Sequence, residues 1–202
     1  MMFPLTTQTF HTTAGARKEV FYPQIIAPTT TFEHDINRTI HLETERLVRE
    51  QTGDAPSTVA EMLGTYELKN NQRDVFSLTL SNYVYYTGAA HGLTVLAGLT
   101  FDLKKERLCS LRDLFKKGSP YVKVLSEQVS KQIRQRNMDI INEFHGISPN
   151  QSFYIADKTL VLFFQLYDLT PYVAGFPMFP ISIYDIEPII DEEGPLGRMF
   201  GN

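Results

Sequence analysis

The residue best suited to acid–base chemistry is His91, in a short loop with a glycine near each end, Gly88 and Gly92. A histidine oriented by a carboxylate can act as a general base. One hypothesis is therefore a hydrolase in which His91 is the base and Asp102 or Asp168 orients it. However, no cysteine, aspartate or glutamate lies close to His91 in sequence, and no serine or threonine stands in a nucleophile motif. We expect no catalytic residue, metal site or cofactor, and a His91 that hydrogen-bonds its own loop.

Aromatic residues suggest binding instead. Tyr83, Tyr85 and Tyr86 precede the histidine loop, and they either form a recognition surface or pack across a sheet. A second loop, residues 167–177, contains two prolines, a glycine and two tyrosines. Such a loop is structured rather than flexible, so we predict binding residues there and beside the first loop. The predicted binding residues are Tyr86, His91, Tyr167, Pro171 and Tyr172.

Two strands are predicted to hold the histidine loop. Before the loop, apolar residues alternate with polar ones from Phe76 to Tyr86, and after it the alternation runs from Leu93 to Leu103. A period of two is typical of a strand with one buried face. Two adjacent strands of this kind pair most economically as an antiparallel hairpin. The loop thus joins two stiff strands, where a functional side chain can be displayed.

Two helices are predicted from capping and periodicity. Thr30 and Glu33 have capping-box spacing, and an apolar stripe follows along residues 32–47. Ser119 as N-cap and Pro120 as the first helical residue begin a second helix that extends to about residue 136. Residues 138–145 are predicted to add a further helical turn or two.

Further strands complete an α+β fold with two main helices on an antiparallel sheet. They are predicted at 5–13 (an edge strand), 17–26, 58–69, and 153–166, the last as a hairpin turning at 157–158. Pro23 indicates an edge or a bulge, because proline cannot donate to a ladder. A turn is expected at 70–72. We predict one domain over residues 1–185 and a poorly ordered tail over 186–202.

Composition narrows the function classes. The chain has 202 residues, of which 43% are hydrophobic, and a net charge of −4. It lacks a basic run interleaved with aromatics, so nucleic-acid binding is not expected. The single cysteine, Cys109, excludes an internal disulfide and lies among leucines as a small buried hydrophobe. We expect no signal peptide and no membrane segment in this sequence, which as given indicates a cytoplasmic chain.

Four motifs, taken in order, resemble one bacterial domain family. They are Tyr83-x-Tyr-x-x-Gly-Ala-Ala-His-Gly92, Thr100-Phe-Asp-Leu103, Leu111-Arg-Asp-Leu-Phe115 and Tyr167-Asp-Leu-Thr-Pro-Tyr-Val-Ala-Gly-Phe-Pro177. The chain is similar here to the RsiV/PdaC-like family, most clearly over residues 66–185. That family includes the extracytoplasmic part of a lysozyme-sensing anti-sigma factor and an accessory domain of a peptidoglycan deacetylase. Ala89 stands where the family usually has a glycine, which affects loop shape more than chemistry.

The resemblance implies a non-catalytic binding or sensing module on the cell-envelope side. Its implied partner is a protein, such as a c-type lysozyme, or a cell-wall glycan. It also implies an α+β fold, in agreement with the patterns above. A third hypothesis from the residues alone is a structural domain that oligomerises through an exposed sheet edge, with Pro23 and the threonine-rich first strand as its guard.

Overall fold

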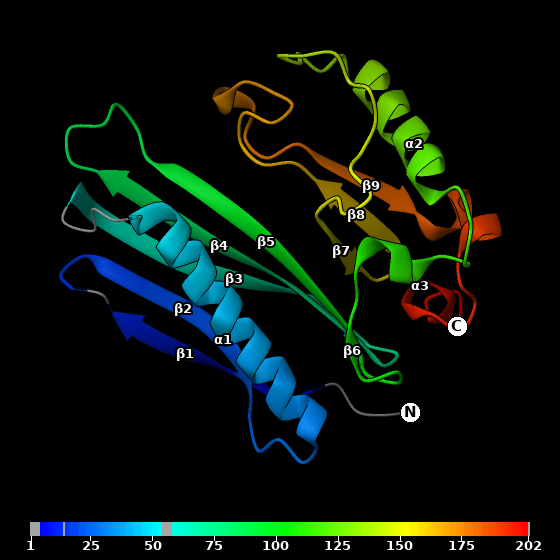
Figure 1. The fold of residues 1–202 in the computed structure, drawn as a ribbon, viewed down its shortest axis with the longest axis horizontal. Helices are drawn as coiled ribbons and strands as arrows, with labels where there is room; N and C mark the ends of the chain where they lie inside the picture. Colours follow the sequence, from blue (N-terminus) through cyan, green and yellow to red (C-terminus); the bar gives the residue numbers. More distant parts are fainter. Residues whose placement is uncertain (1–4, 14, 54–57, 202) are drawn as a thin grey trace. The chain divides into compact units, whose positions relative to one another are not determined.

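The computed structural model describes residues 5–13, 15–53 and 58–201, and they form two compact units (Figure 1). The N-terminal unit contains the described residues of 5–68 and 78–99. The C-terminal unit contains residues 69–77 and 100–201. Among the described residues, none of the helices is long and apolar enough to cross a membrane.

The larger sheet has six strands in the order β1-β2-β3-β4-β5-β6. The strands are β1 (Thr7–Thr13), β2 (Lys18–Ile25), β3 (Val59–Gln72), β4 (Val75–Tyr86), β5 (Leu93–Asp102) and β6 (Arg107–Leu108). The sheet is mostly antiparallel, which confirms the α+β prediction. Its exception is β2, which pairs with β3 in parallel where residues 18–20 face residues 62–64. The predicted edge strand is confirmed, since β1 lies at the end of the sheet.

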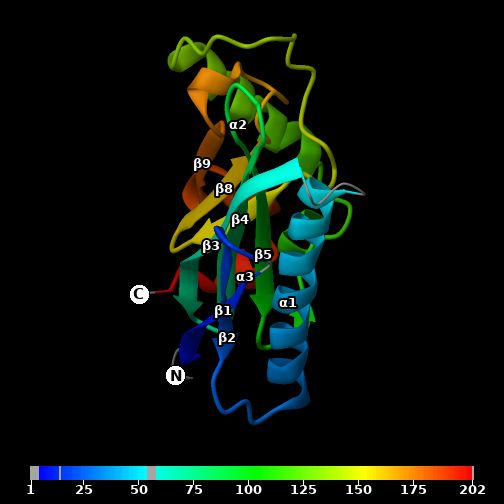
Figure 2. The same cartoon turned by 90° about the vertical axis from the view of Figure 1, so that its left-hand side faces the viewer.

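Helix α1 (Thr31–Thr52) lies along one face of the N-terminal part of this sheet (Figures 1 and 2). Thr30 and Glu33 form the predicted capping box. The N–H groups of Thr29 and Thr30 donate to the Glu33 carboxylate and lower its pKa below the ordinary 4.5, because these bonds favour the charged form. Ile36 and Ile40 are fully buried on the helix face that meets the sheet.

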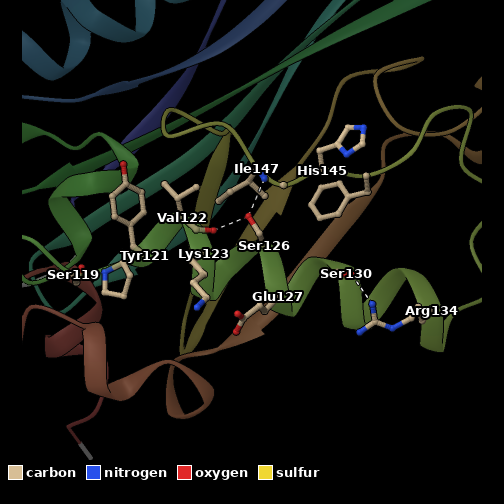
Figure 3. Close-up of a pocket in the computed structure, with 13 residues that line it drawn as sticks. Ser119, Tyr121, Val122, Lys123, Ser126, Glu127, Ser130, Arg134, His145 and Ile147 are labelled. Atoms are coloured by element: carbon tan, nitrogen blue, oxygen red, sulfur yellow. Dashed lines mark hydrogen bonds between the residues drawn. The ribbon is translucent and has the colours of Figure 1, made fainter.

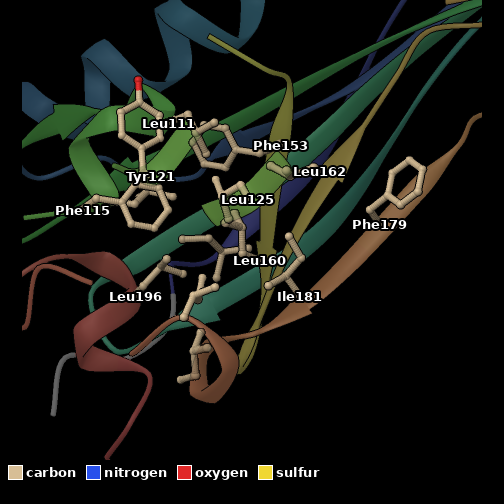
Figure 4. Close-up of a cluster of buried hydrophobic side chains, with 14 of the residues drawn as sticks. Leu111, Phe115, Tyr121, Leu125, Phe153, Leu160, Leu162, Phe179, Ile181 and Leu196 are labelled. Carbon is tan, nitrogen blue, oxygen red and sulfur yellow. The ribbon is translucent and has the colours of Figure 1, made fainter. Parts of the chain in front are cut away.

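The C-terminal unit is organised by α2 (Tyr121–Gln135) and a three-stranded antiparallel sheet in the order β7-β8-β9. The strands are β7 (Phe153–Ala156), β8 (Thr159–Phe163) and β9 (Met178–Ser182). Side chains of α2 and of the sheet form one apolar cluster (Figure 4), which includes Tyr121, Leu125, Leu160, Leu162, Phe179 and Ile181. The predicted hairpin is confirmed, and Asp157 takes the positive φ of 47° that its turn requires.

Three local predictions are wrong. Strand β3 continues through Gln72, and the turn is made instead by Arg73 and Asp74, both with φ of 55°. Two successive residues with positive φ form the tight turn that matches the twist of a hairpin. The N-cap of α2 is Pro120 and not Ser119. Residues 138–145 contain no helix, and the N–H of Ile141 bonds the carbonyl of Leu169 instead of a carbonyl one helical turn earlier.

Strand β2 is an inner strand, but Pro23 is tolerated in it. Pro23 faces Thr9 of β1, and the pairing of β2 with β3 ends at Val20. Because Pro23 lies beyond that ladder, its missing N–H costs no bond to β3. Cys109 is 6% exposed, as expected for a small buried hydrophobe, and burial raises the pKa of its thiol to about 11.

The tail beyond residue 185, expected to be poorly ordered, is folded. It forms η5 (Glu187–Ile189) and α3 (Pro195–Arg198), after η4 (Ile183–Asp185). Ile190, Leu196 and Met199 are fully buried in the apolar cluster of the C-terminal unit. Arg198 also forms an ion pair with Asp102, in which its guanidinium lies 2.7 Å from the carboxylate. The tail is rich in acidic residues and glycine, and this composition predicts disorder although a few apolar residues pack into the core.

We predict that Arg198→Met lowers the free energy of unfolding by about 3 kcal/mol, because it leaves the fully buried Asp102 carboxylate unpaired. Chemical denaturation measures this change. The control is Arg198→Met combined with Asp102→Asn, which removes the uncompensated charge and recovers part of the loss. A double variant no more stable than the single one contradicts this account of the pair.

The single domain expected from sequence leads to a second prediction. Strands β3, β4 and β5 each contribute residues to both units, so the units are joined by three continuous strands. We predict one cooperative thermal transition whose calorimetric and van't Hoff enthalpies agree. Two resolved transitions in differential scanning calorimetry contradict the prediction.

Candidate binding surface

The loop of residues 167–177 presents a pair of stacked tyrosines. The rings of Tyr167 and Tyr172 lie 5.7 Å apart at 30°. Pro171 immediately precedes the short helix η3 (Tyr172–Ala174) and fixes the backbone at its start. Pro171 and Tyr172 are half-buried, and Tyr167 is 48% exposed. The structure therefore brings together three of the five predicted binding residues.

The base of this loop is held by backbone bonds. Ile141 donates its N–H to the carbonyl of Leu169 at 3.0 Å, and Phe164 donates to Pro177 at 3.1 Å. The carboxylate of Asp168 accepts the N–H of Gln165 at 3.2 Å. Leu169 and Thr170 are buried beneath the tip. These anchors predict a loop whose shape is set before any partner arrives, which lowers the entropy lost on binding.

The tip exposes apolar surface that the fold itself does not use. Val173, in η3, is 93% exposed. Tyr167 has a φ of 69°, a conformation that bulky residues rarely adopt and that costs on the order of 1 kcal/mol. Tyrosines are enriched among the residues that contribute most to protein interfaces, and loops on a rigid scaffold commonly carry binding residues. Val173 was missed from the sequence because nothing in its type distinguishes it from core valines.

Phe164, whose N–H anchors the loop at Pro177, belongs to a row of aromatic rings. The ring of Phe164 packs edge-on against those of Phe144 and Phe179, with distances between ring centres of 6.2 Å and 5.6 Å. The guanidinium of Arg136 lies over the Phe179 ring, 5.4 Å from its centre. Phe144 also borders a groove along α2, so the row connects the loop to that groove.

The groove has a volume of about 860 Å³ and runs between α2 and the segment of residues 144–147 (Figure 3). Ser126 ties these two walls together. Its hydroxyl donates to the carbonyl of Val122 at 2.6 Å and accepts the N–H of Ile147 at 3.0 Å. The Tyr121 hydroxyl donates to the carbonyl of Pro149 at 3.1 Å. The wall opposite the helix is thus fixed at two points.

Charged side chains line this groove. Lys123, Glu127, Arg134 and His145 border it, and Arg134 donates to Ser130 at 2.6 Å. The sequence predicts the lysines and glutamate of α2 as an exposed face, but it does not show that residues 144–147 return alongside. That return depends on long-range bonds, so sequence pattern carries no sign of it.

The remaining predicted binding residues, His91 and Tyr86, belong to the N-terminal unit. The exposed ring of His91 bonds the carbonyl of Gly92 at 2.9 Å, as expected of a histidine that hydrogen-bonds its own loop. Gly92 is required there, since a Cβ would lie only 2.2 Å from the Tyr83 ring.

The neighbouring tyrosines also hold structure in place. The Tyr85 hydroxyl donates to the carbonyl of Ala89 at 2.9 Å, inside the same loop. The Tyr86 hydroxyl donates to the carbonyl of Gln51, near the end of α1. Both hydroxyls thus bond backbone carbonyls within the N-terminal unit.

The two carboxylates considered for a hydrolase have other partners. Asp102 pairs with Arg198 and also accepts the N–H groups of Lys104 and Lys105. Asp168 accepts from Gln165. None of these bonds involves His91. Within the described part of the chain, no three histidine, cysteine, aspartate or glutamate residues are grouped as metal ligands.

Comparison with known proteins finds a family match over part of the chain and a shared fold. Residues 112–184 match the family described as a protein of unknown function, DUF3298. The chain is 27% identical over 164 residues to anti-sigma-V factor RsiV of Bacillus subtilis (strain 168), which covers 74% of this chain. The chain spans only 56% of the length of that relative.

Two solved structures share the fold. A DUF3298 family protein from Pseudomonas aeruginosa PAO1 superimposes with a TM-score of 0.71, over 99% of this chain and 98% of that one. A DUF3298 family member from Bacteroides fragilis NCTC 9343 gives a TM-score of 0.69, over 96% and 97%. Both are 16% identical to this chain, so they establish the fold alone.

We predict that Ser126→Ala loosens the outer wall of the groove, because the N–H of Ile147 loses its acceptor. The expected cost is about 1 kcal/mol of stability, with faster amide hydrogen exchange at Ile147. The matched control is Ser130→Ala, four residues along the same helix, which removes only the bond to Arg134. Equal exchange at Ile147 in both variants would show that Ser126 does not hold this wall.

Proposed function

We propose, from the premise that this chain carries an RsiV/PdaC-like domain, that it is a non-catalytic binding module for a protein partner. The single observation that carries the proposal is the anchored loop of residues 167–177, with its exposed valine and stacked tyrosines. Binding energy at protein interfaces is concentrated in a few large side chains held in well-packed settings. Tyr167 and Tyr172 have that character.

The loop supports a protein partner better than a small ligand. Its apolar tip projects outward, whereas small-molecule sites are concave. The groove along α2 lies in the same unit and is connected to the loop through Phe144 and Phe164. We propose that one partner contacts the tip and that its polar groups extend toward Lys123 and Arg134. In this proposal the tip supplies affinity and the groove supplies specificity.

The family resemblance supports the identity of the partner and its location. RsiV is an anti-sigma factor by name, which supports a regulatory role rather than a catalytic one. The sensing role implied for the family suggests a c-type lysozyme as partner and a cell-envelope location. A cell-wall glycan is the other partner that the resemblance implies. We propose the lysozyme interaction because the tip is apolar and convex.

The test is a calorimetric titration of the purified chain with a c-type lysozyme. We expect micromolar or tighter binding, and we expect Tyr167→Ala to weaken it at least tenfold, since the stacked pair is lost at the centre of the contact. The matched control is Tyr184→Ala. Tyr184 is 54% exposed in the same unit but lies outside the loop, so its replacement is expected to leave the affinity unchanged.

The site and the partner are tested separately. Equal losses in the two tyrosine variants would overturn the assignment of the loop. Absence of binding to lysozyme, with the folded state verified by circular dichroism, would overturn that partner. A parallel titration with soluble peptidoglycan fragments then tests the glycan.

A further inference from the structure

A second interaction surface lies in the N-terminal unit, at the free edge of β1. This strand pairs with β2 over seven consecutive residues without a bulge, from Thr7 facing Ile25 to Thr13 facing Glu19. Within the described part of the chain, its other edge faces no strand. An edge strand presents unpaired backbone groups to which another strand can bind.

The residues that face outward can be identified from the ladder. Ile26 donates its N–H to the carbonyl of Thr6 at 3.0 Å, which makes this pair a hydrogen-bonded one. In an antiparallel ladder, hydrogen-bonded and non-hydrogen-bonded pairs alternate. The backbone groups of the even residues in β1 therefore point toward β2. The odd residues present their N–H and C=O groups to the open edge, and these are Thr7, Thr9, His11 and Thr13.

This edge lacks the features that usually prevent strand pairing. Exposed edges are commonly protected by lysine, proline, a bulge or very short length. The sequence of β1 is Thr-Gln-Thr-Phe-His-Thr-Thr, with no lysine, arginine, aspartate, glutamate or proline. Pro23, expected to guard an edge, belongs to the inner strand β2 and leaves the outer edge of β1 unprotected.

We propose that β1 pairs antiparallel with β1 of a second copy of this chain, about a two-fold axis at Phe10. In that register Thr7 faces Thr13 of the other copy and Thr9 faces His11. All four outward-facing residues then find outward-facing partners, and four pairs exchange two hydrogen bonds each. Registers centred elsewhere leave some of these groups unpaired, so the pattern favours this register over its neighbours.

The side chains are compatible with the same register. On one face Phe10 meets its own copy, and Gln8 meets Thr12. On the other face Thr9 meets His11 and Thr7 meets Thr13. Aromatic pairs and threonine pairs across strands are favourable, and no charged residue faces a like charge. This self-complementarity is why the occupant is a second copy rather than an unrelated strand. The contact is small, so the expected dimer is weak and depends on concentration.

Disulfide trapping tests both the contact and its register. Phe10 and its copy form a non-hydrogen-bonded pair with Cα atoms about 4.5 Å apart, which suits a disulfide. We expect Phe10→Cys to form a covalent dimer under mild oxidation. The matched control is Gln8→Cys, on the same face two residues away. In this register Gln8 of one copy faces Thr12 of the other, so the two Gln8 positions lie four residues apart, about 14 Å along the strand. A disulfide cannot bridge that distance. The buried Cys109 is present in both variants, so any cross-linking through it contributes equally to both.

Light scattering of the unmodified full chain supplies an independent measurement. We expect the molar mass to rise toward a dimer from micromolar to millimolar concentration. Thr9→Pro removes an outward N–H and the bond between the hydroxyls of Thr9 and Tyr66, but no bond to β2, so it should abolish this rise. Its melting temperature should match that of Thr9→Val, which loses the same hydroxyl bond. Thr9→Val keeps the N–H and should preserve the rise.

The proposal is overturned by a monomer at every concentration, by association that survives Thr9→Pro, or by equal cross-linking of the two cysteine variants. Should Thr9→Pro fail to fold, the cysteine pair still decides the register. Because β1 and the loop of residues 167–177 belong to different units, failure here leaves the proposed binding function untouched.

Discussion

The C-terminal unit depends on the ion pair between Asp102 and Arg198. Asp102 is fully buried at the end of β5, and the guanidinium of Arg198 comes from the last helix of the chain. The same guanidinium donates to the carbonyls of Arg73 and Asp74 in the β3–β4 turn. In return, Arg73 donates to the carbonyls of Arg198 and Met199.

A buried ion pair adds little net stability, because removing two charges from water costs about as much as their attraction returns. What the pair supplies here is position. Carbonyl groups of a two-residue turn and one carboxylate accept from a single planar guanidinium, a geometry that lysine could not reproduce. The tail is thus fixed where Leu196 and Met199 enter the apolar cluster. That cluster also includes Leu169, at the base of the loop of residues 167–177, so the loop and the tail share one core.

Much of the fold is predictable because it follows from local pattern. The capping box at Thr30 and Glu33 and the alternation through β4 and β5 depend only on residues a few positions apart. The parallel pairing of β2 with β3 and the ion pair of Arg198 depend on residues far apart in sequence. Nothing in the type of Arg198 distinguishes it from a surface arginine, and so the sequence predicts an unordered tail.

The candidate site likewise has parts that follow from local sequence and parts that depend on long-range contacts. Tyr167, Pro171 and Tyr172 are predictable because prolines and tyrosines in one short loop indicate a structured, exposed connection. The groove is not predictable, because its outer wall is held to α2 by bonds between residues far apart in sequence, such as those from Ile147 to Ser126 and from Tyr121 to Pro149. The sequence predicts His91 and Tyr86 as binding residues from their types and their place in or beside a loop. In the structure their side chains bond the carbonyls of Gly92 and Gln51.

The two proposed surfaces would act together because a dimer carries two copies of the loop, without any contact between the surfaces. A dimer formed through β1 presents two copies of the loop of residues 167–177. When a partner is clustered or repeated, the second contact becomes intramolecular, and avidity exceeds the affinity of one loop without any new contact. A weak dimer is sufficient for this effect if a high local concentration drives pairing, since association through an edge strand rises with concentration. Sensing would then respond to the density of the partner as well as to its presence.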